Sequence, residues 1–182
     1  MNICYHCGGK IKVIKDKPYH YDECGMNVVL YGITQFACIE CGETFVSLPK
    51  VNELHRAIGR TICQTKKGLL TENEIKFLRK DMHLKAKHFA QALGITASTV
   101  SRWENGKNEI GETEDRLLRM FYIMYASEQA DHVLCHDVVK MFSELENRRK
   151  KATSGKKVKK ETEIKLNPLD WMSGAKLDFC TA

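Results

Sequence analysis

The sequence lacks several features that would place the protein in a membrane or assign it a reaction. No apolar run approaches the roughly 18 residues of a transmembrane helix, so we expect none. Residues 1–7 lack the basic and then apolar segments of a secretory signal peptide. No Ser/His/Asp or Cys/His set has an organised context, and no phosphate-binding glycine loop is present. We therefore expect a cytoplasmic protein that is not an enzyme.

Cysteine, in contrast, is abundant, and four of the eight cysteines form two matching motifs. Cys4 and Cys7 are followed by glycine, as are Cys38 and Cys41. In the cytosol such cysteines bind metal or stay reduced more often than they form disulfides. Two thiolates three positions apart on a tight turn can face one ion, and the glycine permits the left-handed backbone that closes the turn. The sequence predicts a structural Zn²⁺ site with four cysteine ligands.

Other interpretations of these cysteines stay open. Reduced thiols, redox chemistry or an iron–sulfur cluster are the alternatives, whereas a catalytic zinc is disfavoured because four thiolates leave no position for water. Cys24 precedes a glycine and resembles half of a motif, so its contribution to the metal site is undecided. Cys63 and Cys135 lie on apolar helical faces and are expected in the core.

The pattern of apolar residues predicts an α+β protein. Residues 1–48 read as short strands around the two cysteine motifs, and so small a module needs the metal for stability. From Val51 the period becomes helical, with Leu54, Ala57, Ile58 and Ile62 on one face. We place a domain boundary after this connecting helix, which gives a zinc module at residues 1–66.

Four short helices are expected over residues 69–127. The first begins at the capping box Thr71-x-x-Glu74, the second covers about 85–93, and the third runs from Thr96 to about 104. Gly94 and Gly106 stop the second and third, and the fourth begins near Thr113. A further helix is expected over 128–149. We assign residues 67–149 to an all-α DNA-binding and dimerisation domain.

The excess positive charge lies late in the chain. Residues 146–166 carry nine Lys or Arg against three Asp or Glu, a surplus equal to the whole net charge of +6. We interpret 150–165 as a disordered basic linker, so that residues 150–182 form a basic, disordered C-terminal tail. The run is either a solvated tail or a non-specific phosphate-binding segment. The apolar residues after 166 suggest a linear motif that folds on a partner.

Residues 89–106 have the packing pattern of a helix-turn-helix. Ala90 is small where two helices cross, Gly94 makes the turn, and Val100 and Trp103 close the core. The outer face of the second of these helices is short and polar, which suits the major groove. The candidate DNA-binding residues on this helix and just after it are Ala97, Ser98, Thr99, Ser101, Arg102, Asn105 and Lys107.

The same stretch resembles the Xre/Cro-type helix-turn-helix family, and just before it Ala86 stands where the family usually has Gln. Together with both Cys-x-x-Cys-Gly motifs, residues 1 to about 127 resemble the MqsA (YgiT-type) zinc-finger/helix-turn-helix antitoxins. The resemblance implies a homodimer that binds a palindromic operator, represses its own operon and neutralises a cognate toxin through the zinc module. It places Ser98 and Arg102 at base-contact positions.

Two alternatives differ in partner. The chain could be a stand-alone transcriptional regulator without a toxin, or a zinc-ribbon adaptor that binds only protein. For Arg102 the alternative role is a surface salt bridge, and for Ser98 and Thr99 it is capping or solvating the helix. The basic net charge is compatible with a polyanionic partner without identifying it.

Overall fold

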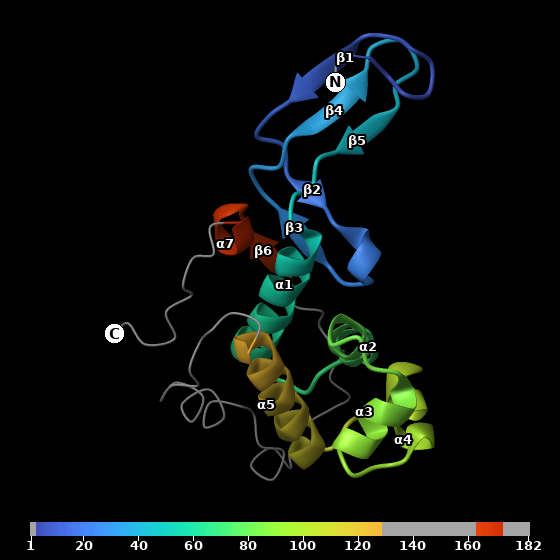
Figure 1. Cartoon of the computed structure of the whole chain (residues 1–182), viewed down its shortest axis with the longest axis vertical. Coiled ribbons are helices and arrows are strands. Elements are labelled where there is room, and N and C mark those ends of the chain that lie inside the picture. The colour runs from blue at the N-terminus through green and yellow to red at the C-terminus, as the bar shows by residue number, and fades with distance from the viewer. Residues whose placement is uncertain (1–2, 129–162, 173–182) are drawn as a thin grey trace, which may run out of the picture.

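A computed structural model shows an elongated molecule with strands at one end and helices at the other (Figure 1). It describes residues 3–128 and 163–172. The predicted helix over 128–149 therefore lies almost wholly outside the described residues. The elements in chain order are β1 (Ile11–Ile14), β2 (Tyr19–His20), the 3₁₀ turn η1 (Asp22–Cys24), β3 (Val28–Leu30), β4 (Gln35–Cys38), β5 (Thr44–Val46), α1 (Val51–Thr65), α2 (Glu72–Asp81), α3 (Ala86–Ala92), α4 (Ala97–Glu104), α5 (Glu112–Glu128), β6 (Ile164–Leu166) and α7 (Leu169–Met172).

The strands form two small sheets rather than one. The first has the order β1-β4-β5, is antiparallel throughout and carries the two cysteine motifs. The second has the order β2-β3-β6, with β2 antiparallel and β6 parallel to the central strand β3. All three residues of β3 are buried, and Val28 and Leu30 belong to the same core cluster as the buried face of α1. A small β module followed by helices confirms the predicted α+β class.

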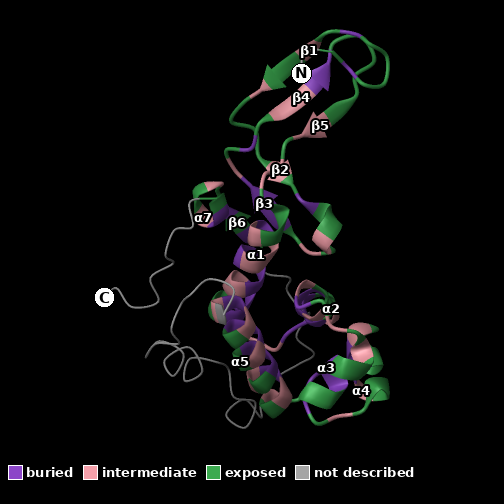
Figure 2. Cartoon of the chain, in the orientation of Figure 1, coloured by how far each residue is buried: buried purple, intermediate pink, exposed green. Residues whose placement is uncertain are grey.

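Helix α1 joins the two ends of the molecule. The residues predicted on its buried face, Leu54, Ala57, Ile58 and Ile62, are all at most 2% exposed. Buried residues follow this helix and continue into β3 and into α5 (Figure 2). The crossing with α5 is close, since a side chain at Gly59 would clash with Tyr122. One continuous hydrophobic core therefore runs through α1 and contains residues from both sides of the boundary that the sequence suggests at residue 66.

The helical half follows the boundary signals in the sequence. The capping box is present, with the Thr71 hydroxyl accepting from the Glu74 amide and the Glu74 carboxylate accepting from the Thr71 amide. Gly94 and Gly106 end their helices at φ +67° and +65°, a left-handed backbone that favours glycine. The first of these turns holds α3 against α4.

The C-terminal segment corrects one expectation. Residues 163–172 belong to the stretch expected to be a disordered tail, yet they form β6 and α7 against β3 and α1. The physical reason is three apolar anchors, Ile164, Leu166 and Trp171, each at most 5% exposed. Residues 150–162 and 173–182 lie outside the described part of the chain.

A buried arginine fixes α5 to the end of α1. Arg119 is fully buried, and its Nε donates to Asp115 Oδ2 at 2.8 Å. Its two terminal nitrogens donate to backbone oxygens at and beyond the C-terminus of α1, namely those of Cys63 (3.0 Å), Lys66 (2.8 Å) and Gly68 (2.7 Å). The other Asp115 oxygen accepts from the Leu70 amide at 2.8 Å. The guanidinium thus satisfies carbonyls that the helix end leaves without partners.

Within the described residues, none of the helices has both the length and the apolar character that a membrane crossing requires.

The first prediction concerns this buried arginine. Arg119→Ala leaves the Asp115 carboxylate and several backbone oxygens buried without their donor, so we expect a loss of about 3–5 kcal/mol in the free energy of unfolding. Urea titration followed by circular dichroism measures it. Arg116→Ala, on the same helix but only partly buried, is the matched control and should change stability by less than about 1 kcal/mol. Equal effects of the two variants would contradict the assigned role.

Candidate functional site

The two cysteine motifs form two similar turns. Gly8 and Gly42 follow the second cysteine of each motif at φ +75° and +74°. The Gly8 amide donates to the Cys4 carbonyl at 2.9 Å, and the Gly42 amide donates to the Cys38 carbonyl at 3.2 Å. Each turn is therefore closed by its own backbone, with the left-handed glycine that the sequence predicts.

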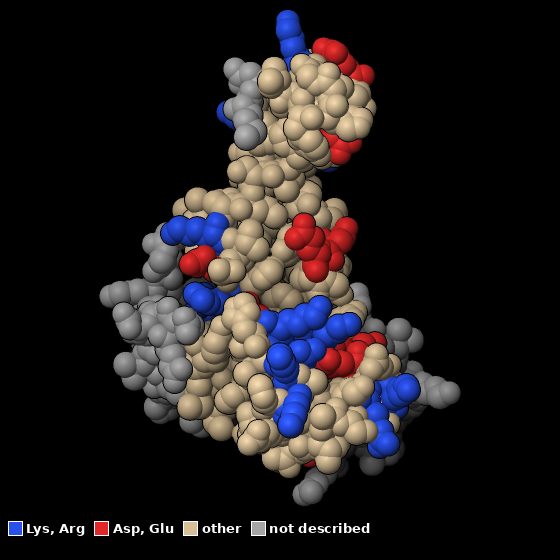
Figure 3. Space-filling model, turned by 45° about the vertical axis from the view of Figure 1, so that its right-hand side comes forward, with Lys and Arg blue, Asp and Glu red and all other residues tan. Residues whose placement is uncertain are grey.

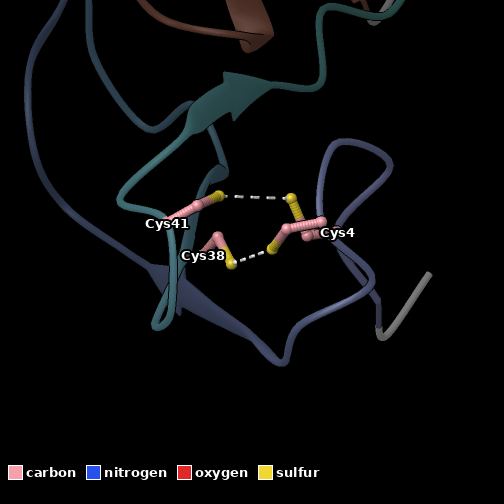
Figure 4. A group of neighbouring side chains, drawn as sticks. Cys4, Cys38 and Cys41 are labelled. Atoms are coloured by element: carbon pink, nitrogen blue, oxygen red, sulfur yellow. Dashed lines mark hydrogen bonds between the residues drawn. The ribbon is translucent and has the colours of Figure 1, made fainter.

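The four sulfurs of these turns converge on one point. Cys4 Sγ lies 3.8 Å from Cys41 Sγ, and Cys7 Sγ lies 3.5 Å from Cys38 Sγ. All four sulfurs lie within 4.8 Å of one another. Figure 4 shows Cys38 and Cys41 on one turn facing Cys4 on the other. A tetrahedral Zn²⁺ with Zn–S bonds of about 2.3 Å separates its sulfurs by about 3.8 Å. The geometry fits a structural metal bound by four thiolates.

Backbone hydrogen bonds favour the thiolate form of these cysteines, and desolvation and the neighbouring thiols oppose it. The Gly9 amide donates to Cys7 Sγ at 3.4 Å. Hydrogen bonding from the Cys41 backbone lowers the pKa of Cys38 to about 7, against desolvation that raises it. The Glu43 backbone likewise lowers the pKa of Cys41, but the Cys7 thiol, desolvation and the other two thiols outweigh it and raise that pKa to about 12. Four thiolates so close together need a cation to hold their charge.

The other described cysteines lie apart from the cluster. Cys24 is half-buried, and its thiol donates to the backbone oxygens of Tyr21 at 3.4 Å and Met26 at 3.8 Å. Cys63 is fully buried on α1, and desolvation raises its pKa to about 12. Cys24 is therefore not among the four residues that converge, and Cys63 packs in the core as the sequence predicts. Cys135 and Cys180 lie outside the described residues.

An apolar row crosses the cysteine-bearing sheet, and the sequence does not predict it. Val13 pairs with Phe36, and Phe36 pairs with Phe45, so the three share one face. The Phe36 and Phe45 rings stack at 5.3 Å, and Tyr5 meets Phe45 edge-on at 5.5 Å. Tyr5 is 74% exposed and Val13 is 52% exposed. The alternation along each strand predicts the face on which a single residue lies. Only the register between strands shows that Val13, Phe36 and Phe45 are neighbours.

Helix α4 presents the polar surface that the sequence assigns to DNA. Val100 and Trp103 face the core, while Ala97, Ser98, Ser101 and Arg102 are exposed. Thr99 is half-buried, and its hydroxyl lies 2.9 Å from that of the N-cap Thr96. The residue that caps this helix is Thr96, whose hydroxyl accepts from the Thr99 amide at 3.2 Å. Capping was the alternative role considered for Thr99 itself.

The end of α4 is fixed by its neighbours. The Asn105 side-chain amide donates to the Ser101 carbonyl at 2.7 Å, and Asn105 and Lys107 are both exposed just beyond the helix. Glu104 forms a two-bond ion pair with Arg79 of α2, which anchors the helix from behind. Among residues 3–128 and 163–172, no ion pair engages Arg102. The salt bridge considered for Arg102 is therefore not observed in that part of the chain.

Basic side chains gather on the helical half of the molecule. In the view of Figure 3, Lys and Arg cluster beside a smaller acidic group over this half, below the narrow cysteine-bearing module. The described structure thus presents two separate candidate sites, a metal cluster at one end and a polar helix face near the other.

The second prediction tests the metal cluster. Cys38→Ser removes one of four ligands, so we expect loss of the bound metal and faster amide exchange across residues 3–46, with α2–α5 unchanged. Metal analysis and hydrogen exchange measure these effects. The control is Cys24→Ser, whose sulfur lies outside the cluster. Full metal content in Cys38→Ser, or equal metal loss in both variants, would contradict the assignment.

The chain was also compared with known proteins. A comparison with curated proteins found no match. A family model described as the antitoxin component of a bacterial toxin-antitoxin system, MqsA, matches residues 1–124. The match covers both cysteine motifs, α1, α4 and most of α5, and ends before β6 and α7. The chain belongs to the MqsA family of antitoxins.

Proposed function

We propose that the chain is a Zn²⁺-stabilised antitoxin that binds operator DNA through α4 and its cognate toxin through the cysteine-bearing module. The observation that carries the proposal is the joining of a four-cysteine cluster and an exposed polar helix in a chain of this family. Four thiolates favour zinc among the common metals and leave no open position, so the ion holds the module together.

DNA recognition is assigned to the exposed face of α4. Its outward residues Ala97, Ser98 and Ser101 are short, which lets a helix lie deep in the major groove. Arg102 extends from the same exposed face without an ion-pair partner among the described residues, so its guanidinium is available for guanine or phosphate. Asn105 and Lys107 follow the helix and suit phosphate contacts. Thr99 is partly buried, and its main role is to donate its amide to the capping hydroxyl of Thr96.

A homodimer on a palindromic operator completes the proposal for DNA. Leu117, Met120 and Met124 are spaced along α5 at helical intervals and are 37%, 39% and 41% exposed. Such a stripe suits packing against the same stripe of a second copy. Two copies of α4 would then read two half-sites, and binding at the chain's own promoter would repress its operon.

The third prediction tests this DNA contact. Arg102→Ala should weaken operator binding by about 10- to 100-fold, because one arginine–base contact is lost, and it should leave thermal stability unchanged. Fluorescence anisotropy with operator DNA at fixed salt measures the affinity. Lys12→Ala removes the same charge from β1 and serves as the control, with an expected change below about threefold. If the two variants bind alike, α4 is not the reading helix.

The toxin contact is assigned to the apolar row across the β1-β4-β5 sheet. Val13, Phe36, Phe45 and Tyr5 offer an apolar and aromatic surface on a metal-fixed sheet, and protein interfaces favour such residues. Adjacent residues of β1 point to opposite faces of the sheet, so Lys12 lies on the other side.

The fourth prediction uses that alternation. Val13→Asp places a charge in the row and should weaken toxin binding by at least about 10-fold, with bound metal retained. Lys12→Asp, one residue away on the other face, should bind the toxin nearly as the parent does. Calorimetry with the protein encoded beside this chain's gene measures both. Equal weakening, or none, would exclude this face as the contact.

A further inference from the structure

Residues 163–172 occupy the edge of β3 as an added strand. Ile164 pairs with Val28 and Leu166 pairs with Leu30 in parallel register. The Ile164 amide donates to the Asn27 carbonyl at 3.0 Å, and the Tyr31 amide donates to the Leu166 carbonyl at 2.8 Å. Without this segment β3 would be an edge strand with unpaired backbone groups, which is the usual template for strand addition.

The side chains of the segment, like its backbone, make specific contacts with the rest of the molecule. Ile164, Leu166 and Trp171 are buried at 4%, 5% and 3% exposure, whereas Lys165 between them is exposed. They join the core that α1 and β3 provide, and α7 lies against α1 (Figure 1). The segment therefore presents two apolar residues two positions apart and an indole five positions later.

Polar contacts hold the far end of the segment. The Trp171 indole Nε1 donates to the Pro49 carbonyl at 3.3 Å, and Lys50 Nζ donates to the Met172 carbonyl at 3.0 Å. Gly32, at φ +70°, accommodates Pro168 closely, since a Cβ there would lie 3.3 Å from Pro168 Cδ. The segment lies in a groove between β3 and α1. The groove binds its backbone, its three apolar anchors and its far end, so it selects for a peptide with these features.

The groove and its occupant come from different parts of the chain. Val28–Leu30 and α1 lie within residues 1–124, which the family model matches, whereas residues 163–172 lie beyond them. Residues 129–162 connect the segment to α5. We propose that the groove between β3 and α1 is a binding site for an extended peptide, and that residues 163–172 are its tethered ligand, bound in cis and able to leave and rebind as one unit.

Tethering determines how the groove behaves. A linked ligand has an effective concentration on the order of millimolar, so it excludes an untethered peptide of the same sequence until the link is cut. While bound it covers the β3 edge, and when released it opens that edge to another extended segment. Residues 163–172 thus control access to the β3 edge, which lies in the same N-terminal module as the metal cluster.

The test uses the full chain with a site for a sequence-specific protease inserted between residues 150 and 162. A fluorescent synthetic peptide of residues 163–172 should bind the cut chain saturably, and the uncut chain on the order of 100-fold more weakly. A peptide carrying Ile164→Ser should lose binding, whereas one carrying Lys165→Ser should bind as the parent does. Equal binding to cut and uncut chains, or failure of the peptide to exchange into the cut chain, overturns the proposal.

A second pair of variants gives the same test without a cut. In the full chain Leu166→Ser weakens the tethered copy, so that chain should bind the labelled parent peptide, whereas the Lys165→Ser chain should exclude it. Circular dichroism and metal content establish that both chains are folded. A folded Leu166→Ser chain that excludes the peptide as well as the Lys165→Ser chain does would show that the segment is an integral strand and not a ligand.

Discussion

The arrangement of the molecule depends on the buried guanidinium of Arg119. Its donors satisfy Asp115 and four backbone oxygens where α1 ends, so the last turn of α1 and the middle of α5 are joined by charge-assisted hydrogen bonds in a dry site. The other half of α1 contacts β6 and α7 and shares a buried core with Val28 and Leu30 of β3. Both ends of the protein are consequently built on one helix. We infer that this arginine favours the observed arrangement, because moving α5 away from the end of α1 would leave a buried charge unpaired.

The two ends meet different physical needs. The cysteine-bearing sheet buries few residues, among them Cys4, Ala37 and Cys38, and cannot be stabilised by hydrophobic burial alone. A metal held by the four cysteines would supply that stability and leave the sheet face with Val13, Phe36 and Phe45 available for contact. The helical half has an apolar core under α4, with Val100 and Trp103 inside and the Arg79–Glu104 pair behind. The folding of this helix therefore does not depend on its polar face, which is left available for contact.

Sequence patterns among neighbouring residues predicted much of this structure. The features that those patterns missed depend on contacts between residues far apart in the sequence. The cysteine turns, the buried face of α1, the capping box at Thr71 and the glycine stops after α3 and α4 depend on residues close in sequence. The pairing of β6 with β3 joins residues more than 130 positions apart, and three residues of alternating polarity are too short a pattern to predict a strand. The burial of Arg119 was likewise not predicted, because arginine is almost never fully buried unless it is paired, and its partners lie mostly in a distant part of the chain. The apolar row required the strand register.

The function proposed for this member of the family is neutralisation of a toxin. The most direct measurement is growth of cells that express the small protein encoded beside this chain's gene, with and without this chain. We expect the neighbouring protein to arrest growth alone and co-expression of this chain to restore growth, with the two proteins purifying as one complex. Growth arrest that persists at full expression of the folded, metal-loaded chain would rule out the antitoxin function.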